Sequence, residues 1–197
     1  DECTSGFRET FGGLHKKYNV EPDMCILGKA LGNGYAVTAV LGKGDIMDKA
    51  EETFISSTFW TERIGSVAAL ETLDIMAETK SWKTITQKGK YVKSEWRRIA
   101  KEKGISINIT GLDALASFTI EKYDNRVIKT FILQEMLKRG FLAGMSLYVS
   151  VAHEDWIIKD YIKNLREVFE EIAMSNNDDI IKNIEGKISS NGFARLN

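Results

Sequence analysis

The chain has 197 residues, of which 43% are hydrophobic and 28% are charged, so it has the make-up of an ordinary globular protein with one domain or two small ones. Its 27 basic and 28 acidic residues are spread along the whole chain and give a formal net charge of -1. This balance excludes a field that favours nucleic acid or an anionic membrane, and no apolar run approaches the roughly 20 residues that cross a bilayer. Small molecules or other protein chains are the expected partners.

Only two cysteines occur, Cys3 and Cys25, and neither lies in a pattern typical of a disulfide framework or a metal site. This usage favours a reducing compartment, and we expect the protein to be cytoplasmic. The chain begins with Asp1 and opens on a polar segment, so we expect the natural protein to begin further upstream.

Residues 1–103 alternate short apolar runs with glycine-containing turns and helical segments, a pattern typical of an α/β domain. The expected strands are short apolar runs between turn signals, at residues 24–27 and 36–41. The expected helices are at residues 14–18, 45–50, 61–78 and 82–103. The apolar pattern of residues 61–78 predicts a buried helix on the sheet, and residues 82–103, stopped by Gly104, are expected to link two domains.

Residues 104–175 change to a pattern that predicts a small α+β domain with antiparallel strands. The expected strands are residues 105–109, 115–120 and 147–151, and the expected helices are residues 126–139 and 154–174. Residues 176–197 are polar and weakly patterned, and we expect them to form a C-terminal tail.

The most informative residues lie before residue 35, where four short segments follow one another. They are Asp1-Glu2, Gly6-Phe7-Arg8, Pro22-Asp23 and Gly28-Lys29-Ala30-Leu31-Gly32-Asn33-Gly34. In this order and at this spacing they resemble the signature of the class III aminotransferases. The resemblance continues through Ala39-Val40 and Ser57-Thr58, and covers most of the chain, most strongly to about residue 80.

The resemblance implies an α/β fold of the type I pyridoxal-phosphate-dependent transferases, with residues 1–103 as the later part of the large domain. It implies pyridoxal 5'-phosphate as cofactor, an amine donor and a carbonyl acceptor as substrates, and a homodimer. Lys29 would be the catalytic Schiff-base lysine, and Asp1 would pair with the pyridine nitrogen of the cofactor. Thr58 would bind the cofactor phosphate of the neighbouring subunit. The residues that cradle the phosphate and stack on the ring are expected upstream.

The physical chemistry of Lys29 agrees with this interpretation. A lysine of ordinary pKa is neutral in only roughly one molecule in a few thousand at pH 7, yet its amine must be neutral to attack an aldehyde. A glycine-rich turn after a buried strand would hold the amine at a sheet edge, where α/β proteins bind ligands. The alternatives are a solvated loop lysine or a nucleotide phosphate loop, but in such a loop the lysine follows the glycines and precedes Ser or Thr, and here Ala30 follows Lys29.

Other residues leave alternatives open. Asp1 can be a flexible terminal carboxylate, Thr58 can be an ordinary helix N-cap, and Arg63 can be a substrate clamp or, as we favour, a surface ion pair. His15 and His153 have no metal-like companions nearby, so we expect capping or surface histidines and no metal site.

Two features bear on the substrate. Within the family, two segments are most similar to the glutamate-1-semialdehyde 2,1-aminomutase branch, so an aminomutase proper is one alternative. They are Asp1-Glu2 to Gly6-Phe7-Arg8 and Tyr148-Val149-Ser150-Val151-Ala152-His153. Residues 60–63 depart from the family, which commonly has glycines and an Asn-Pro pair there. A rival from another class is a non-catalytic dimerisation or binding module that keeps the fold.

Overall fold

The computed structural model describes residues 1–58 and 60–190, which form two compact units. The first unit runs from Asp1 to Thr86 and the second from Gln87 to Asn197. The sequence predicts a boundary after Lys103, whereas the structure divides the chain inside helix α3 (Ser81–Lys103). The reason is that the apolar side of α3 from Val92 onward belongs to the core of the second unit.

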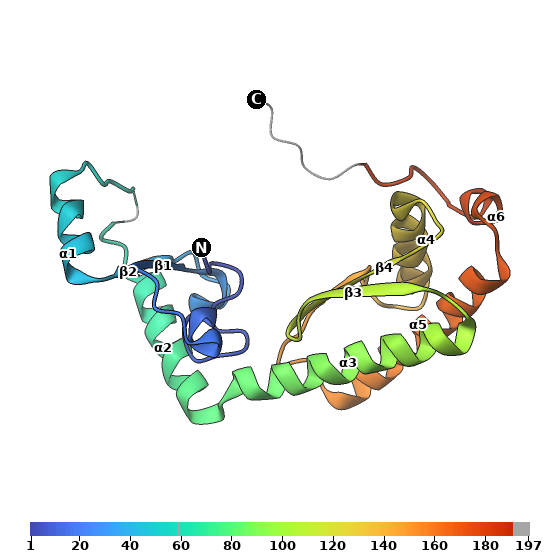
Figure 1. Cartoon of the computed structure of the whole chain (residues 1–197), viewed down its shortest axis with the longest axis horizontal. Helices are drawn as coiled ribbons and strands as arrows, with labels where there is room; N and C mark the ends of the chain where they lie inside the picture. The colour runs from blue at the N-terminus through green and yellow to red at the C-terminus, as the bar shows by residue number, and fades with distance from the viewer. Residues whose placement is uncertain (59, 191–197) are drawn as a thin grey trace. The chain divides into compact units, whose positions relative to one another are not determined.

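The first unit is built on a two-stranded antiparallel sheet (Figure 1). β1 (Met24–Leu27) pairs with β2 (Ala39–Gly42), with Leu27 opposite Ala39. The helical elements of this unit, besides the start of α3, are the 3-10 helices η1 (Leu14–Tyr18), η2 (Lys29–Leu31) and η3 (Asp48–Glu52) and the α-helices α1 (Gly44–Met47) and α2 (Ile64–Thr79). The predicted strands and helices are therefore confirmed, with β2 beginning three residues later than expected.

The core of the first unit is small. Its buried residues are Phe7, Cys25, Leu27, Leu31 and Met76, and Trp82 stacks on Phe11 at its edge with ring centroids 5.2 Å apart. The prediction of a helix at residues 61–78 that is buried on the sheet is right only in part. Met76 of α2 is buried in this core and Ala69 and Leu73 pack against it, but other large apolar side chains of α2 are exposed. Ile64, Val67 and Leu70 are each 60% or more exposed, since a two-stranded sheet is too narrow to cover the apolar surface of a helix of 16 residues.

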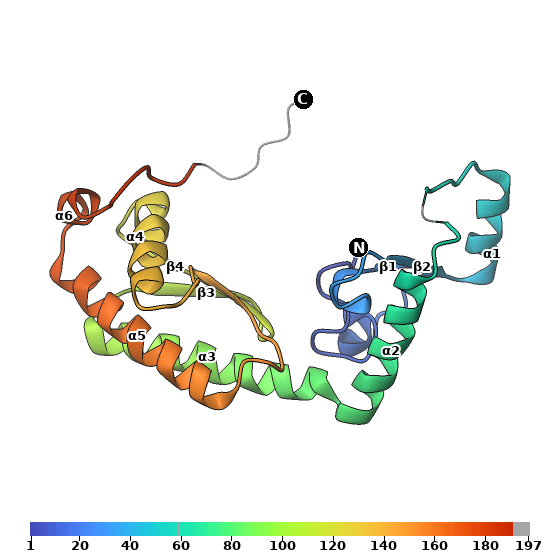
Figure 2. The ribbon, with the colours of Figure 1, turned by 180° about the vertical axis from the view of Figure 1, so that it is seen from behind.

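The second unit is an α+β domain with antiparallel strands, as the sequence predicts. Its three strands form one sheet in the order β3-β4-β5. Its further elements are β3 (Ile107–Leu112), β4 (Leu115–Ile120), α4 (Asn125–Lys138), β5 (Ser146–Tyr148), α5 (Asp155–Met174) and α6 (Asn177–Lys182). Helices α3 and α5 lie side by side (Figure 2), and the ion pair between Lys103 Nζ and Glu170 Oε2 joins them at 3.0 Å.

Three aromatic rings form the centre of this second core, one from each of α3, β4 and α5. Phe118 lies edge-on to Trp96 and to Phe169, with centroid distances of 4.8 and 5.6 Å. The indole Nε1 of Trp96 donates a 3.1 Å hydrogen bond to the hydroxyl of Tyr161, so the one polar atom of this fully buried indole has a partner. Burial raises the pKa of Tyr161.

The C-terminal segment holds more structure than its polar sequence predicts. α6 begins with a capping box in which Asn176 and Asp179 satisfy each other's backbone N–H groups, and Ile180 is fully buried. A single apolar anchor is too weak a signal for periodicity analysis, so residues 177–182 were expected to be tail; residues 191–197 lie outside the described part.

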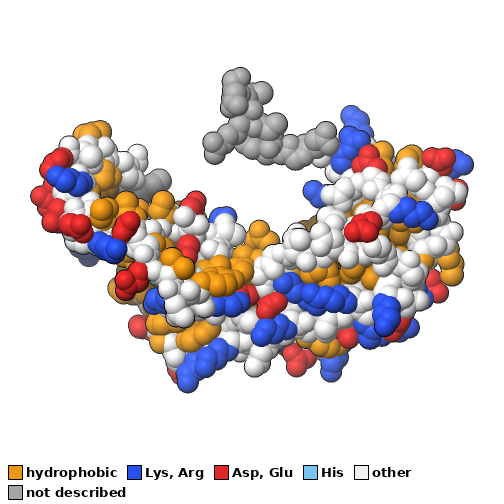
Figure 3. Space-filling view, viewed as in Figure 1, with side chains coloured by type: hydrophobic (Ala, Val, Ile, Leu, Met, Phe, Trp, Pro, Cys, Tyr) orange, Lys and Arg blue, Asp and Glu red, His pale blue; other side chains and the backbone are white. Residues whose placement is uncertain are grey.

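The surface mixes both signs of charge. On the face drawn in Figure 3, Lys and Arg side chains alternate with Asp and Glu over both units, with hydrophobic side chains between them. Among the described residues, no helix combines the length and the apolar character needed to span a membrane.

Candidate active site

Lys29 lies just after the end of β1, on the turn that the sequence predicts. Gly28 separates it from the strand, and Lys29 opens the short helix η2 with a φ of 45°, in the left-handed region. This backbone conformation is uncommon for a residue with a Cβ and often marks a functional position. The side chain is exposed, and its Nζ donates a hydrogen bond to Thr4 Oγ1.

A cavity of about 640 Å³ lies beside Lys29. Its walls come from the N-terminal segment, the chain between η2 and β2, and the start of α2. The residues that line it include Lys29, Cys3, Tyr35, Thr38, Trp60 and Glu62. Sequence reasoning missed Cys3 and Tyr35 as wall residues, because no local pattern shows that residues 3 and 35 lie near each other in the fold.

Two glycines make this wall possible. A Cβ on Gly28 would lie 2.7 Å from Sγ of Cys3 and 3.1 Å from Cγ2 of Thr38. A Cβ on Gly32 would lie 2.1 Å from the carbonyl oxygen of Tyr35. Gly28 is therefore required by the close side chains of Cys3 and Thr38, and Gly32 by the close backbone of Tyr35.

Asp1 lies next to this wall without lining it. Its Oδ1 accepts a 2.9 Å hydrogen bond from the backbone N–H of Cys3, and the side chain is exposed. The following residue, Glu2, donates its N–H to the carbonyl of Ile26 at 2.9 Å, which holds the N-terminal segment beside β1. Asp1 thus precedes a residue that is hydrogen-bonded to β1, and its role toward a cofactor stays a prediction.

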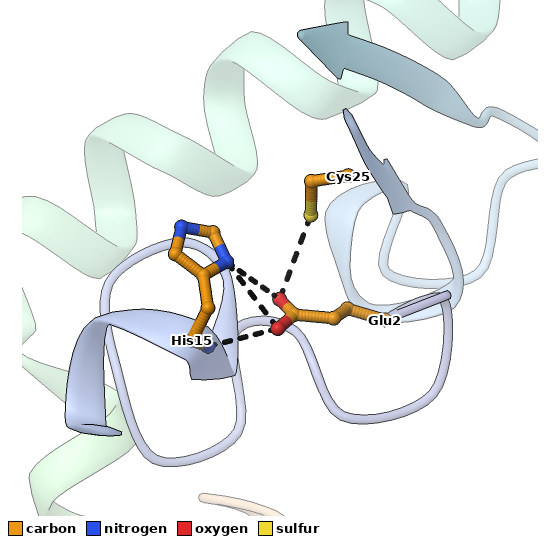
Figure 4. Close-up of side chains that lie close together, drawn as sticks. All are labelled: Glu2, His15 and Cys25. Atoms are coloured by element: carbon orange, nitrogen blue, oxygen red, sulfur yellow. Dashed lines mark hydrogen bonds and ion pairs between the residues drawn. The ribbon is translucent and has the colours of Figure 1, made fainter. Parts of the chain in front are cut away.

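Glu2 has a different set of side-chain partners, among them His15 and Cys25 (Figure 4). Its carboxylate accepts the backbone N–H groups of Leu14 at 2.7 Å and His15 at 2.8 Å, and so caps η1. Nδ1 of His15 lies 3.2 Å from Oε2, and Sγ of Cys25 lies 3.5 Å from the same oxygen. His15 therefore lies at a helix cap, as expected, with a carboxylate and a thiol as neighbours that the sequence spacing did not show.

The pKa values of the Glu2 carboxyl and the Cys25 thiol are shifted in opposite directions. Burial acts to raise the pKa of Glu2, but the N–H groups of His15 and Leu14 outweigh it and lower the pKa below 4.5. Burial, together with the negative charge of Glu2, raises the pKa of the Cys25 thiol.

Thr58 and Arg63 lie on the segment that leads into α2. Thr58 is exposed in a turn six residues before α2 begins, so its interpretation as the helix N-cap is wrong. The N-cap residue is Arg63, and the side chain of the preceding Glu62 accepts the N–H of Ile64 at 2.7 Å through Oε1. Arg63 is exposed and makes no ion pair with residues 1–58 or 60–190, so the favoured surface ion pair is not found there.

In the second unit, His153 caps a turn before α5. Its Nδ1 accepts the N–H of Ser150 at 3.2 Å, and its carbonyl accepts a 2.6 Å hydrogen bond from Lys88 Nζ. Burial lowers the pKa of His153, and the charge of Lys88 acts in the same direction. This agrees with the expected capping histidine.

Comparison with known protein families decides the identity of the fold. Residues 1–173 match the model of the family described as aminotransferase class-III. The chain belongs to the class III aminotransferase family. Membership confirms the resemblance seen in the sequence and indicates pyridoxal phosphate as the cofactor.

Curated class III relatives have two different activities. The chain is 29% identical over 185 residues to the 3-aminobutyryl-CoA aminotransferase of Cloacimonas acidaminovorans (strain Evry), covering 87% of this chain and 43% of that protein. It is 28% identical over 187 residues to the glutamate-1-semialdehyde 2,1-aminomutase of Saccharolobus islandicus (strain L.S.2.15 / Lassen #1), covering 88% and 44%. The chain therefore spans less than half the length of these relatives.

Solved structures confirm the type I transferase fold. The chain superposes on the FumI protein of Sphingopyxis sp. MTA144 with a TM-score of 0.82 at 22% identity, covering 94% of this chain and 44% of that one. An omega-transaminase from Sphaerobacter thermophilus gives a TM-score of 0.76 at 19% identity, covering 89% and 44%. The α/β architecture expected from the sequence is thereby established, over less than half the length of these structures.

The residues around Lys29 fit pyridoxal phosphate. The cavity has the size of a small-molecule site, with the amine of Lys29 at one wall, and a Cβ on Gly28 would press against Cys3 and Thr38, which line it. The hydroxyl groups of Tyr35 and Thr38 and the indole of Trp60 add hydrogen-bonding and apolar surface to the same walls. These features suit a flat, phosphorylated ring.

Proposed function

We propose that the protein carries out pyridoxal-phosphate-dependent amino-group transfer, with Lys29 as the Schiff-base lysine. The observation that supports this most is the position of Lys29. Its amine stands at a cavity of about 640 Å³, on a glycine turn after β1 and in a left-handed backbone conformation. When bound, the cofactor supplies an electron sink for the carbon that exchanges its amino group.

The side chains of this chain would bind, orient and move protons. Nζ of Lys29, as a free amine, would take a proton from the substrate carbon as general base and would deliver it to the cofactor carbon as general acid. Thr4 Oγ1, which accepts a hydrogen bond from Nζ, would orient the amine between these steps.

Asp1 would hold the ring nitrogen in its protonated form. The support is local: the N–H of Glu2 bonds to Ile26 of β1, and the Asp1 carboxylate bonds to Cys3, which lines the Lys29 cavity. A carboxylate within reach of a protonated ring nitrogen stabilises that charge and keeps the ring electron-withdrawing.

Thr58 would bind the cofactor phosphate of a second copy, and the active unit would be a homodimer. The support is that Thr58 is exposed and does not line the cavity of its own chain, whereas its neighbour Ser57 does. The same stretch is strongly apolar at its surface, with Phe54 95% and Trp60 67% exposed. Apolar surface of this kind is typical of a region that associates with another chain.

The substrate would present its amine on a carbon that carries no carboxylate. Residues 141–154 contain no arginine or lysine, so that stretch offers no planar fork to hold an α-carboxylate. The relatives point the same way, since one is named for a 3-amino acyl-CoA and the other for a semialdehyde. A glutamate-1-semialdehyde aminomutase proper is the alternative within the family. We also propose a cytoplasmic location, because Cys3 and Cys25 are both free thiols.

Reduction of the purified natural-length protein with borohydride, followed by peptide mapping, tests the central role of Lys29. We expect the cofactor label on the peptide that holds Lys29, and a colourless, inactive Lys29→Ala variant. Lys43→Ala is the matched control, because Lys43 is also exposed on the first unit but is ion-paired with Asp23 at 2.8 Å, away from the Lys29 cavity. A label on another lysine would refute the assignment, and a folded protein that takes up no cofactor would favour the non-catalytic module.

A further inference from the structure

Glu2, His15 and Cys25 bring an oxygen, a nitrogen and a sulfur atom together at a point that the Lys29 chemistry does not use (Figure 4). The three residues come from three segments: the N-terminal segment, helix η1 and strand β1. Their potential ligand atoms all lie within 4.8 Å of one another.

The two distances from the Glu2 carboxylate to its neighbours suit a tetrahedral metal site. Zinc binds carboxylate oxygen and imidazole nitrogen at about 2.0–2.2 Å and thiolate sulfur at about 2.3 Å, which places neighbouring ligand atoms about 3.3–3.6 Å apart at tetrahedral angles. Oε2 of Glu2 lies 3.2 Å from Nδ1 of His15 and 3.5 Å from Sγ of Cys25. Both distances from the carboxylate oxygen are thus close to those of a tetrahedral site, and Nδ1 and Sγ lie within 4.8 Å of each other.

The carboxylate is already oriented by the backbone. Leu14 N–H bonds to Oε2 and His15 N–H bonds to Oε1, so the side chain of Glu2 cannot rotate away without losing both. Groups that fix a ligand in this way raise metal affinity. Cys25 is 7% exposed, which keeps bulk water from competing at the sulfur.

A fourth ligand of the metal ion could lie in the cavity beside His15 and Cys25. His15 and Cys25 line a cavity of about 640 Å³ whose wall also contains Phe7 and Leu41. The residues that line it are all different from those that line the Lys29 cavity. A water molecule or a small ligand there would complete four-coordination.

We propose that Glu2, His15 and Cys25 form a Zn²⁺ site with one position open to this second cavity. Cys25 would release its thiol proton on binding, and His15 would bind through Nδ1 with its proton on Nε2. The carboxylate and thiolate would together neutralise the two charges of the ion. A bound ion would join the N-terminal segment to η1 and β1.

Titration of the chelator-stripped, natural-length protein with Zn²⁺ against a chromophoric competitor tests the proposal. We expect one equivalent to bind, and the variants Cys25→Ser and His15→Gln each to lose about 10- to 100-fold or more in affinity, since loss of even a supporting contact costs that much. The chain contains its own matched controls, Cys3→Ser and His153→Gln, which should bind Zn²⁺ like the parent protein. Co²⁺ in place of Zn²⁺ should give a thiolate-to-metal absorption band that Cys25→Ser abolishes.

A second measurement on the unmodified protein covers the case in which a variant fails to fold. Zn²⁺ should slow alkylation of Cys25 and leave the rate at Cys3 unchanged, as read by mass spectrometry of the two peptides. Unchanged alkylation of Cys25, or Zn²⁺ affinity that Cys25→Ser and His15→Gln leave intact, would show that the three residues serve only as the hydrogen-bonded cap of η1 and would overturn the proposal.

Discussion

The substitution Gly28→Ala tests whether the wall of the Lys29 cavity is built by close approach. The new Cβ would lie 2.7 Å from Sγ of Cys3 and 3.1 Å from Cγ2 of Thr38, so at least one of them must move. Cys3 cannot swing aside freely, because its N–H bonds to Asp1 and the adjacent Glu2 is paired with β1. Overpacking of this kind costs about 1–3 kcal/mol. We expect Gly28→Ala to lower the free energy of unfolding by that amount and to weaken cofactor retention, since Lys29 is the next residue.

Urea unfolding followed by circular dichroism, with cofactor release measured in parallel, provides the assay. Adding Cys3→Ala to Gly28→Ala removes the sulfur and should recover most of the loss, leaving the smaller Thr38 contact; the coupling between the two changes should be about 0.5–3 kcal/mol. Gly44→Ala is the control, because a Cβ there meets open space, and it should change stability by no more than about 0.5 kcal/mol. The reasoning would be refuted by a Gly28→Ala protein as stable as Gly44→Ala, or by a double variant no better than the single one.

Three further predictions concern the carboxylate of Glu2, the dimer and the substrate. The pKa of Glu2 is lowered from 4.5, so the contribution of its carboxylate to stability is present above that pH and is lost as the pH falls through the lowered value. The Glu2→Gln variant should therefore lose less stability than the parent protein between about pH 6 and pH 3, as measured by urea midpoints. An identical loss in both proteins would contradict this. Thr58→Ala should weaken cofactor retention by about 1–3 kcal/mol without changing the cavity of its own chain, and an active, cofactor-loaded monomer in light scattering would argue against a contact across a dimer. Alanine and aspartate should convert the yellow enzyme slowly in stopped flow, because residues 141–154 offer no cation; conversion as fast as by the best amine found would show that the missing arginine is irrelevant.

The sequence predicts an element well where neighbouring residues alone determine its type and its ends. Strand β4 (Leu115–Ile120) has the predicted bounds, since it is apolar and lies between turn residues, and helix α5 ends at Met174 as expected. The α/β class and the Lys29 turn were accessible because the family signature is itself a local string of residues. Its glycines reflect the crowding at Cys3 and Tyr35 that the structure shows.

Where prediction failed, the cause was a contact between distant positions. The apolar pattern of α2 shows that its side chains can be buried, but it does not show which residues would cover them. The exposure of Val67 and Leu70 therefore could not be predicted from this pattern. Helix α6 depends on Ile180 fitting into a core built by other helices. The cluster of Glu2, His15 and Cys25 joins positions 10 to 23 residues apart, which no spacing rule for metal ligands covers.

The buried indole described above gives the protein an optical reporter of one unit alone. Trp96 is fully buried and hydrogen-bonded to Tyr161 in the second unit, whereas Trp60 and Trp156 are about two-thirds exposed. Fluorescence of a shielded indole shifts to longer wavelength when water reaches it, while exposed indoles change little. Trp82, which stacks on Phe11, reports in the same way on the first unit. Single-tryptophan variants would therefore show whether the two units melt together or one before the other.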